Sequence, residues 1–309
     1  MSRFPLRTVF YIVLDTFLLA VCLLHIPYIA QRSKAPFEVA ANDTLVRIVS
    51  VDSSAMEAIC VGDVLIRWNG QSVTIAEAVE YLADLSPIGA TIRVDVQRGN
   101  EMLTTDVKLI RYYGSPRFLI ISFFVGLAIF GVGIFILLSR PIDKAARALH
   151  WALITLATTM MVTWGLAEPG ALETYVSRIL WFVSYLGVAV AFFFFTLVFP
   201  TERHPRLANY VWLLALLVLA VGSAFSVSYF LALSSASPQS LKTFQDMFQV
   251  FHISLFVFVG GGLFNFGRAV LRASSNEERQ KMYWLLWGLS IGTLPYLVLH
   301  ILPQVLFST

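Results

Sequence analysis

Four polar side chains lie inside long apolar stretches of this sequence: Asp15, His252, Asn265 and His300. Ionisable and strongly polar groups are costly in hydrocarbon, so residues of this kind are candidates for function. No two of the four lie three or four positions apart, the spacing at which one helix presents a metal site or an acid–base pair. We therefore expect them to support helix packing or to lie at the membrane interface. Asp15 stands apart, because a buried carboxylate needs a partner or a proton and the sequence identifies neither.

Motifs for catalysis are missing from the sequence. A membrane metalloprotease needs His-Glu-x-x-His, which follows none of the five histidines. A membrane serine protease would need Gly-x-Ser-Gly, and Gly222-Ser223-Ala224-Phe225 does not fit it. Phosphate-binding and dinucleotide-binding glycine motifs are absent, and two cysteines, Cys22 and Cys60, give neither a disulfide framework nor a thiolate metal site. We predict no enzyme activity, catalytic residue, metal or cofactor for these residues.

The composition is that of a membrane protein. Hydrophobic residues make up 58% of the chain and charged residues 13%, whereas soluble domains have about 45–50% and about 25%. A helix needs about 20 apolar residues to cross the hydrocarbon core. Seven windows have this character: 8–28, 117–138, 148–166, 179–199, 208–233, 247–270 and 282–307. The sequence therefore predicts an α-helical polytopic membrane protein with about seven spans, and no internal repeat suggests a transporter.

The positive charges predict how the chain is oriented. The basic residues of alternate short connections are Arg3, Arg7, Arg140, Lys144, Arg147, Arg203, Arg206, Arg268, Arg272, Arg279 and Lys281. The opposite connections, 167–178 and 234–246, hold only Arg178 and Lys242. Because Lys and Arg are retained on the cytoplasmic side, we predict a cytoplasmic N-terminus in the cell (inner) membrane, with residues 29–115 in the periplasm or extracellular space.

Three regions follow from this topology. Residues 1–28 form the N-terminus and first span, residues 29–115 an extracytoplasmic domain, and residues 116–309 a six-helix bundle. Seven spans would leave the C-terminus outside, directly after a span. We therefore expect that a further span and a cytoplasmic output domain follow in a longer protein.

The segment between the first two spans is rich in predicted strands. Residues 45–51 and 64–68 have strand character, and Asn69-Gly70 after the second of them is a strong two-residue hairpin signal. Apolar residues at helical spacing predict a helix over 75–85. A last hairpin is expected from residues 91–97 and 102–109, turning at Arg98-Gly99-Asn100.

This order of elements, with Gly62-Asp63-Val64-Leu65, Asn69-Gly70 and Arg98-Gly99, resembles a circularly permuted PDZ domain of the bacterial type. PDZ domains bind an extended peptide as an added strand. The resemblance implies a groove between strand 45–51 and helix 75–85 that takes a peptide or protein C-terminus outside the membrane. The groove candidates are Leu45, Val46, Arg47, Ile48, Ile75, Val79 and Leu82. The glycine-rich carboxylate loop is missing from residues 41–44, so a spacer or dimerisation element is an equal alternative.

Two membrane motifs extend the resemblance. Leu197-Val198-Phe199-Pro200, and Asn276 to Lys281 followed by Trp284 to Leu289, are similar to the sensor regions of bacterial signalling proteins such as competence-pheromone receptor histidine kinases. This implies a membrane sensor that is the input module of a signal-transduction protein. The alternative is a PDZ-containing membrane scaffold, or a noncatalytic partner of an intramembrane protease. Besides the peptide, we expect contact with the lipid bilayer, an apolar ligand in the bundle and a homodimer as candidate interactions, and no nucleic acid.

Overall fold

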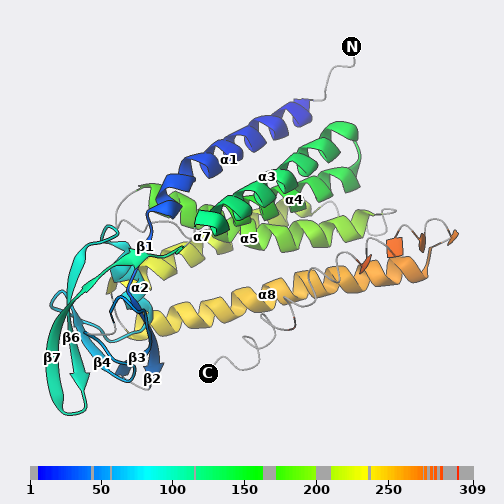
Figure 1. Cartoon of the computed structure of the whole chain (residues 1–309). Helices are drawn as coiled ribbons and strands as arrows, with labels where there is room; N and C mark the ends of the chain where they lie inside the picture. Colours follow the sequence, from blue (N-terminus) through cyan, green and yellow to red (C-terminus); the bar gives the residue numbers. More distant parts are fainter. Residues whose placement is uncertain are drawn as a thin grey trace.

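A bundle of long helices and one small β-rich domain make up the described part of the chain (Figure 1). The structure is a computed structural model, and it describes residues 6–42, 45–55, 58–114, 116–162, 172–199, 210–235, 238–273 and a few positions between 275 and 298. The bundle helices are α1 (Leu6–Ala30), α3 (Pro116–Ser139), α4 (Lys144–Met161), α5 (Leu172–Val198), α7 (Val211–Ser235) and α8 (Pro238–Leu271). The domain lies between α1 and α3 in sequence and at one end of the bundle in space.

Five of these helices are long and apolar enough to cross a membrane: α1, α3, α5, α7 and α8. The predicted window 148–166 corresponds to α4, which is not among the five. Lys144, Arg147 and His150 make α4 more polar, and packing between α1, α3 and α5 covers its buried face. Most of the window 282–307, including His300, lies outside the described residues. A polytopic membrane protein is thus supported, while seven spans stay a prediction.

The lipid-facing surface is plainest on α1 and α3. Phe17 and Leu24 of α1 are 62% and 71% exposed, and Phe135 of α3 is 70% exposed. Large apolar side chains exposed along a whole helix are expected where hydrocarbon is the solvent.

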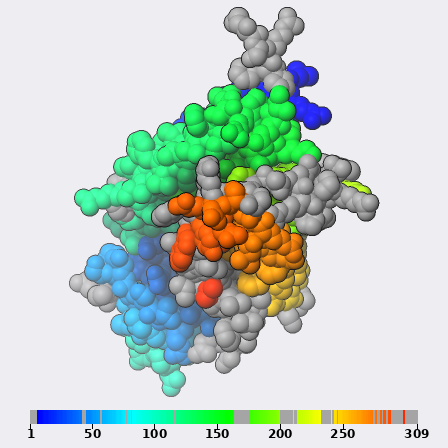
Figure 2. Space-filling view, turned by 90° about the vertical axis from the view of Figure 1, so that its right-hand side faces the viewer, coloured from blue at the N-terminus to red at the C-terminus, as the bar shows by residue number. Residues whose placement is uncertain are grey.

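The helix ends alternate in the way that the charge pattern predicts. Arg140 and Lys144 lie where α3 turns into α4, and Arg268 and Arg272 lie at the end of α8. Figure 2 looks at this end of the bundle, remote from the domain, with α3 and α4 in green and α8 in orange. The described basic connections therefore share one end, although their assignment to the cytoplasm stays a prediction.

The domain is built on an antiparallel sheet with the order β2-β3-β4-β6-β7. Its strands are β2 (Phe37–Asn42), β3 (Leu45–Val51), β4 (Val64–Trp68), β6 (Thr91–Arg98) and β7 (Glu101–Lys108), with the short β5 (Gln71–Ser72) paired to β4 and the helix α2 (Glu77–Asp84) packed beside them. Asn69 and Gly70 have φ of 47° and 80° and connect β4 to β5. The predicted hairpin turn is confirmed, because few other residue pairs tolerate two positive φ angles.

A two-stranded stem joins the domain to the helices. Strand β1 (Ser33–Lys34) follows α1, and β8 (Ile110–Arg111) precedes α3; they pair antiparallel, with Ser33 opposite Arg111. The chain thus enters and leaves the domain through hydrogen-bonded neighbours, which restricts the motion of the domain on its connections.

Glycines allow two pairs of bundle helices to approach closely. A Cβ on Gly222 of α7 would lie 2.8 Å from Cγ2 of Val183 and 3.0 Å from its backbone nitrogen on α5. A Cβ on Gly262 of α8 would lie 2.8 Å from the Phe192 ring, also on α5. Small residues at membrane helix contacts have this role, so α5 is the helix against which α7 and α8 are fitted.

Candidate functional site

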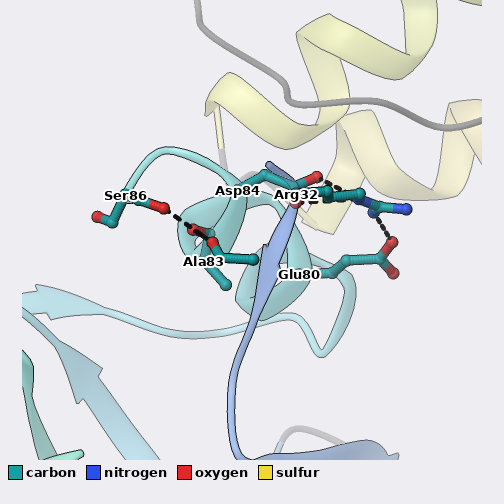
Figure 3. A network of polar contacts seen from close by, with 6 residues as sticks. Arg32, Glu80, Ala83, Asp84 and Ser86 are labelled. Atoms are coloured by element: carbon teal, nitrogen blue, oxygen red, sulfur yellow. Dashed lines mark hydrogen bonds and ion pairs between the residues drawn. The ribbon is translucent and has the colours of Figure 1, made fainter. Parts of the chain in front are cut away.

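A buried arginine stands at the point where α1, the stem and α2 meet. Arg32 is 1% exposed, and its Nε donates to both carboxylate oxygens of Asp84, each at 3.0 Å. Its Nη2 donates to Glu80, one helical turn earlier on α2 (Figure 3). Because an ionised group out of water is costly unless it is paired, Arg32 fixes α2 to the end of α1.

Neighbouring contacts tighten the same junction. The Ser33 hydroxyl donates to the backbone oxygen of Ala83 at 2.6 Å or of Ser86 at 2.8 Å, near the C-terminal end of α2. The guanidinium of Arg32 lies 3.8 Å from the centre of the Tyr112 ring, which follows β8. We call Arg32, Ser33, Glu80, Asp84 and Tyr112 the Arg32 clamp. It connects α1, α2 and both strands of the stem.

The clamp also faces the bundle. Helix α2 contacts α7, and Figure 3 shows pale yellow bundle helices beside the clamp. Arg178, at the domain end of α5, is 3% exposed and close enough for its charge to act on Asp84. The clamp is therefore an electrostatic contact between the domain and the bundle as well as a link to α1.

The electrostatics of Asp84 are dominated by burial. Burial raises the pKa of Asp84 to about 6, although the positive charges of Arg32 and, more weakly, Arg178 act to lower it. For Arg32, burial acts to lower the pKa, but Asp84 and Glu80 outweigh it and raise the pKa above its ordinary value. Arg32 thus stays charged, whereas Asp84 depends on Arg32 to remain ionised near neutral pH.

A second buried pair lies inside the bundle. The Asp15 carboxylate of α1 and the His150 ring of α4 are both fully buried, with Nε2 of His150 3.5 Å from Oδ2 of Asp15. The other ring nitrogen, Nδ1, lies 3.0 Å from the backbone oxygen of Gly133 on α3. Tyr11 stacks on the ring, with centroids 6.3 Å apart. His150 is the partner of Asp15 that the sequence does not identify.

The geometry limits the protons that this pair can hold. A carbonyl oxygen only accepts, so Nδ1 of His150 must carry a hydrogen to bond Gly133. Nε2 then faces the carboxyl group, and a second proton must lie on one of these two groups to avoid a lone pair opposed to a buried charge. Among the described residues no hydrogen bond reaches either Asp15 oxygen. The pair is therefore a neutral unit with one shared proton.

Both pairs are placed by a single stripe along α1. Its buried residues include Thr8, Asp15, Cys22 and Ile29, each seven positions from the next, with His25 beside them. A seven-residue period keeps one narrow seam of a helix against its neighbours. From Asp15 to the end of α1 is about 22 Å at 1.5 Å per residue, and the helix continues through Pro27 to Ala30, two residues before Arg32.

The other predicted intramembrane residues have separate places. Nδ2 of Asn265 donates to the backbone oxygen of Thr196 at 2.7 Å, a hydrogen bond that joins α8 to α5. His252 of α8 is 3% exposed, and its ring lies 4.1 Å from that of Phe248. His300 lies outside the described residues. The four candidates do not form one site.

The predicted peptide groove needs a correction. Strand β3 is paired with β2 along its length and with β4 at Val46 and Arg47, so it is an interior strand without a free edge. The edge strand on this side is β2, which the sequence reading did not predict. From Val46 to Ile48 the backbone of β3 is bonded on both sides, so a peptide cannot be added there.

Several groove candidates also face inward. Val46, Ile48 and Val79 are buried in the domain core with Trp68, and Ile75 is 5% exposed. Leu82 is half-buried against the same core. Only Leu45 and Arg47, on the opposite face of β3, are exposed. These residues were named as groove candidates because of the resemblance to a PDZ domain, and the period of a strand or helix does not reveal which face meets the core.

The Gly62-Asp63 and Arg98-Gly99 motifs are structural. Asp63 is 2% exposed and accepts from Nη2 of Arg98 at 2.8 Å and from the backbone nitrogen of Cys60 at 2.9 Å. The hydrogen bond from Arg98 holds the pKa of Asp63 below its ordinary value. This pair joins β6 to the turn before β4.

Comparison with models of protein families, with characterised proteins and with solved structures found no match. A proposal for its function therefore depends on the geometry of the chain itself. Arg32, Asp84 and His150 are the important residues that the sequence reading missed. Arg32 lies just after an apolar span, and Asp84 ends an amphipathic helix; a cation beside a span is usually attributed to topology alone.

Removing the charge of Arg32 should show that Asp84 depends on Arg32 to remain ionised. We expect Arg32→Met to destabilise the full chain by about 3 kcal/mol or more, the cost of breaking a buried ion pair. Without Arg32, burial raises the pKa of Asp84 further above its unfolded value of about 3.9. The contribution of Asp84 to stability is complete below its unfolded pKa and is lost as pH rises through its folded pKa. Arg32→Met should therefore lose more stability at pH 8 than at pH 5. Thermal unfolding in detergent measures both effects.

Arg32→Met with Asp84→Asn is the matched variant, because it removes both charges together. It should restore much of the stability that the single variant loses, and it should remove most of the pH dependence that the single variant adds. Equal losses for the single and double variants, or a single variant that is more stable at pH 8 than at pH 5, would contradict the clamp.

The shared proton predicts an unequal response of Asp15 and His150. Asp15→Asn keeps the unit neutral, and its amide can donate to Nε2, so we expect a cost of about 1 kcal/mol or less. His150→Leu leaves a buried carboxylate alone and should cost about 3 kcal/mol or more. Unfolding of the full chain in detergent distinguishes them. If Asp15→Asn were as damaging as His150→Leu, a single proton held between the two groups would be contradicted.

Proposed function

We propose that this chain is the input module of a membrane signalling protein, in which the β-rich domain binds a peptide or protein segment outside the membrane and the helices respond. The Arg32 clamp is the observation that carries this proposal. Input requires a mechanical connection between the domain and the bundle, and the clamp joins α2, the stem and α1 through the buried charges of Arg32 and Asp84 and the partly exposed charge of Glu80.

The energetics of the clamp favour a coupling role over a spacer role. A domain that only separates or displays needs no buried ionised group at its base, since apolar packing of the same volume is often equally stable or better. A buried ion pair does define one orientation, because Arg32 has few other acceptors in reach. Displacing α2 therefore disturbs α1 directly.

The peptide site fits the free edge of β2. Its backbone pairs only with β3 among the described strands, and Glu38 and Ala40 are exposed. An added strand would use the outer hydrogen-bonding groups of β2. This places the ligand on the edge strand and not on the predicted strand 45–51.

Transmission then follows α1. A ligand that moves α2 relative to the stem changes the position of Arg32, and α1 carries this change to the neutral Asp15–His150 unit and so to α4. The ligand must bind one arrangement more tightly than the other, or no population shift results. The topology with the domain outside, the inner-membrane location and a signalling output are parts of the same proposal.

Peptide-dependent motion at the far end of the bundle tests this function. Ile142 and Leu271 are 80% and 75% exposed, at the α3–α4 turn and at the end of α8. Spin labels on Ile142→Cys and Leu271→Cys, in a Cys60→Ser background, report the distance between them by pulsed electron resonance. A C-terminal peptide selected from a displayed library against the full chain in nanodiscs should shift this distance.

The double variant Arg32→Met with Asp84→Asn, which removes the two buried charges of the clamp, is the control. It should bind the selected peptide with similar affinity and lose the distance shift, since β2 is unchanged. Peptide binding without a shift in the unmodified clamp would favour the scaffold alternative. A shift that persists in this double variant would mean that the signal does not pass through Arg32.

A further inference from the structure

A cavity of about 470 Å³ opens between α4, α5 and α7, with Tyr11 of α1 at one side. Its walls are mainly apolar, and four small residues make room for it: Ala148 on α4, Gly187 and Ala191 on α5, and Ala215 on α7. Such a volume falls in the range of ligand sites, about 300–1,000 Å³. The cavity does not involve the domain or the Arg32 clamp.

The cavity has the depth of one membrane leaflet. On α4 its lining runs from Lys144 to Thr155, and on α5 from Phe194 back to Val183. Eleven residues of helix rise about 16 Å, and half of the hydrocarbon core is about 15 Å. The lining therefore extends from one membrane surface to about the middle, as an acyl chain does.

Two cations lie at the end of this lining that meets the membrane surface. Lys144 and Arg147, in the first turn of α4, both line the cavity. Cations in the first turn of a helix are disfavoured by the helix dipole, so helix stability does not explain them. Asp143 caps the same helix, because its carboxylate accepts from the backbone nitrogen of Ala145 at 2.8 Å. Its Oδ2 lies 3.9 Å from Nη1 of Arg140. Asp143 is not part of the lining.

We propose that this cavity binds an anionic phospholipid from the leaflet on the side of Lys144. One acyl chain lies along the small residues of α5, and the phosphate is held by Lys144 and Arg147. Basic pockets between membrane helices recognise anionic headgroups in this way. A purely apolar ligand would bring no charge complementary to the two cations of the lining, and a peptide would leave polar backbone in an apolar slot. The site goes beyond the proposed signalling function and does not depend on it.

The bound lipid would touch the interior pair indirectly. Tyr11 and Trp151 line the cavity, and both rings contact His150, with centroids 6.3 Å and 5.1 Å from its ring. An acyl chain against these two rings would hold His150 toward Asp15. Lipid occupancy and the packing of α1 on α4 are therefore expected to favour each other.

Photocrosslinking tests this site in the full chain in nanodiscs. The probes are phosphatidylglycerol and phosphatidylcholine that carry the same diazirine near the end of one acyl chain. Phosphatidylglycerol should label α4 and α5 at the deep end of the cavity, near Thr155 and Val183. Lys144→Gln with Arg147→Gln should reduce this labelling about fivefold for each cation, since each contributes about 1 kcal/mol.

Two variants provide the controls. Arg268→Gln with Arg272→Gln makes the same charge change at the same end of the bundle, outside the lining, and should leave the labelling unchanged. Ala191→Leu fills the cavity and should reduce labelling there by either lipid. Phosphatidylcholine labelling of the exposed α3 face around Phe118 and Phe124 should be the same in every variant, which shows that each is folded.

Equal labelling of the cavity by both lipids would overturn the headgroup assignment. Labelling that Ala191→Leu does not reduce would place the lipid on the outer surface of the bundle. A loss as large in Arg268→Gln with Arg272→Gln as in the Lys144 and Arg147 variant would reduce the effect to general surface charge.

Discussion

A charge removed from water must meet an opposite charge or a proton, and this requirement organises the described part of the chain. It is met once on α1 and once two residues after the end of α1. At the domain end of α1, Arg32 meets the carboxylates of α2, and near the middle of α1, Asp15 meets His150 of α4. Apolar packing alone would leave α1 with little to determine its rotation or height, because most of its surface is suited to lipid. The two pairs fix both.

These two contacts differ in ways that suit different roles. The Arg32 clamp is charged, lies at the boundary between domain and bundle, and includes Glu80, which is 49% exposed and so can exchange with water. The Asp15–His150 unit is neutral overall and sealed from solvent. A charged contact at a boundary responds to displacement and to pH, whereas a sealed neutral unit keeps α1 and α4 in register. With both contacts, a displacement of the domain can move α1 while α1 stays packed on α4.

Local features could be predicted from the sequence and long-range ones could not. The Asn69-Gly70 turn depends on two adjacent residues, and the apolar helices depend on runs within each segment, so both are readable. The partner of Asp15 is 135 positions away, and Asp84 is 52 positions from Arg32; nothing in either neighbourhood indicates the pairing. Strand β2 was missed because Glu38, Ala40 and Ala41 give it weak strand character, and the groove was consequently placed on an interior strand. The window 148–166 stays a predicted span, because its residues beyond 162 lie outside the described part of the chain.

The central claim is that the domain is held in one orientation on the bundle, and the orientation can be measured without any ligand. Cys60 is a free, exposed thiol in the domain, and Ile142→Cys adds a label at the remote end of the helices. Pulsed electron resonance between the two in nanodiscs should give a single narrow distance distribution, which broadens when Arg32 and Asp84 are both neutralised. A broad distribution in the unaltered clamp, as expected for a domain on flexible tethers, would contradict the account.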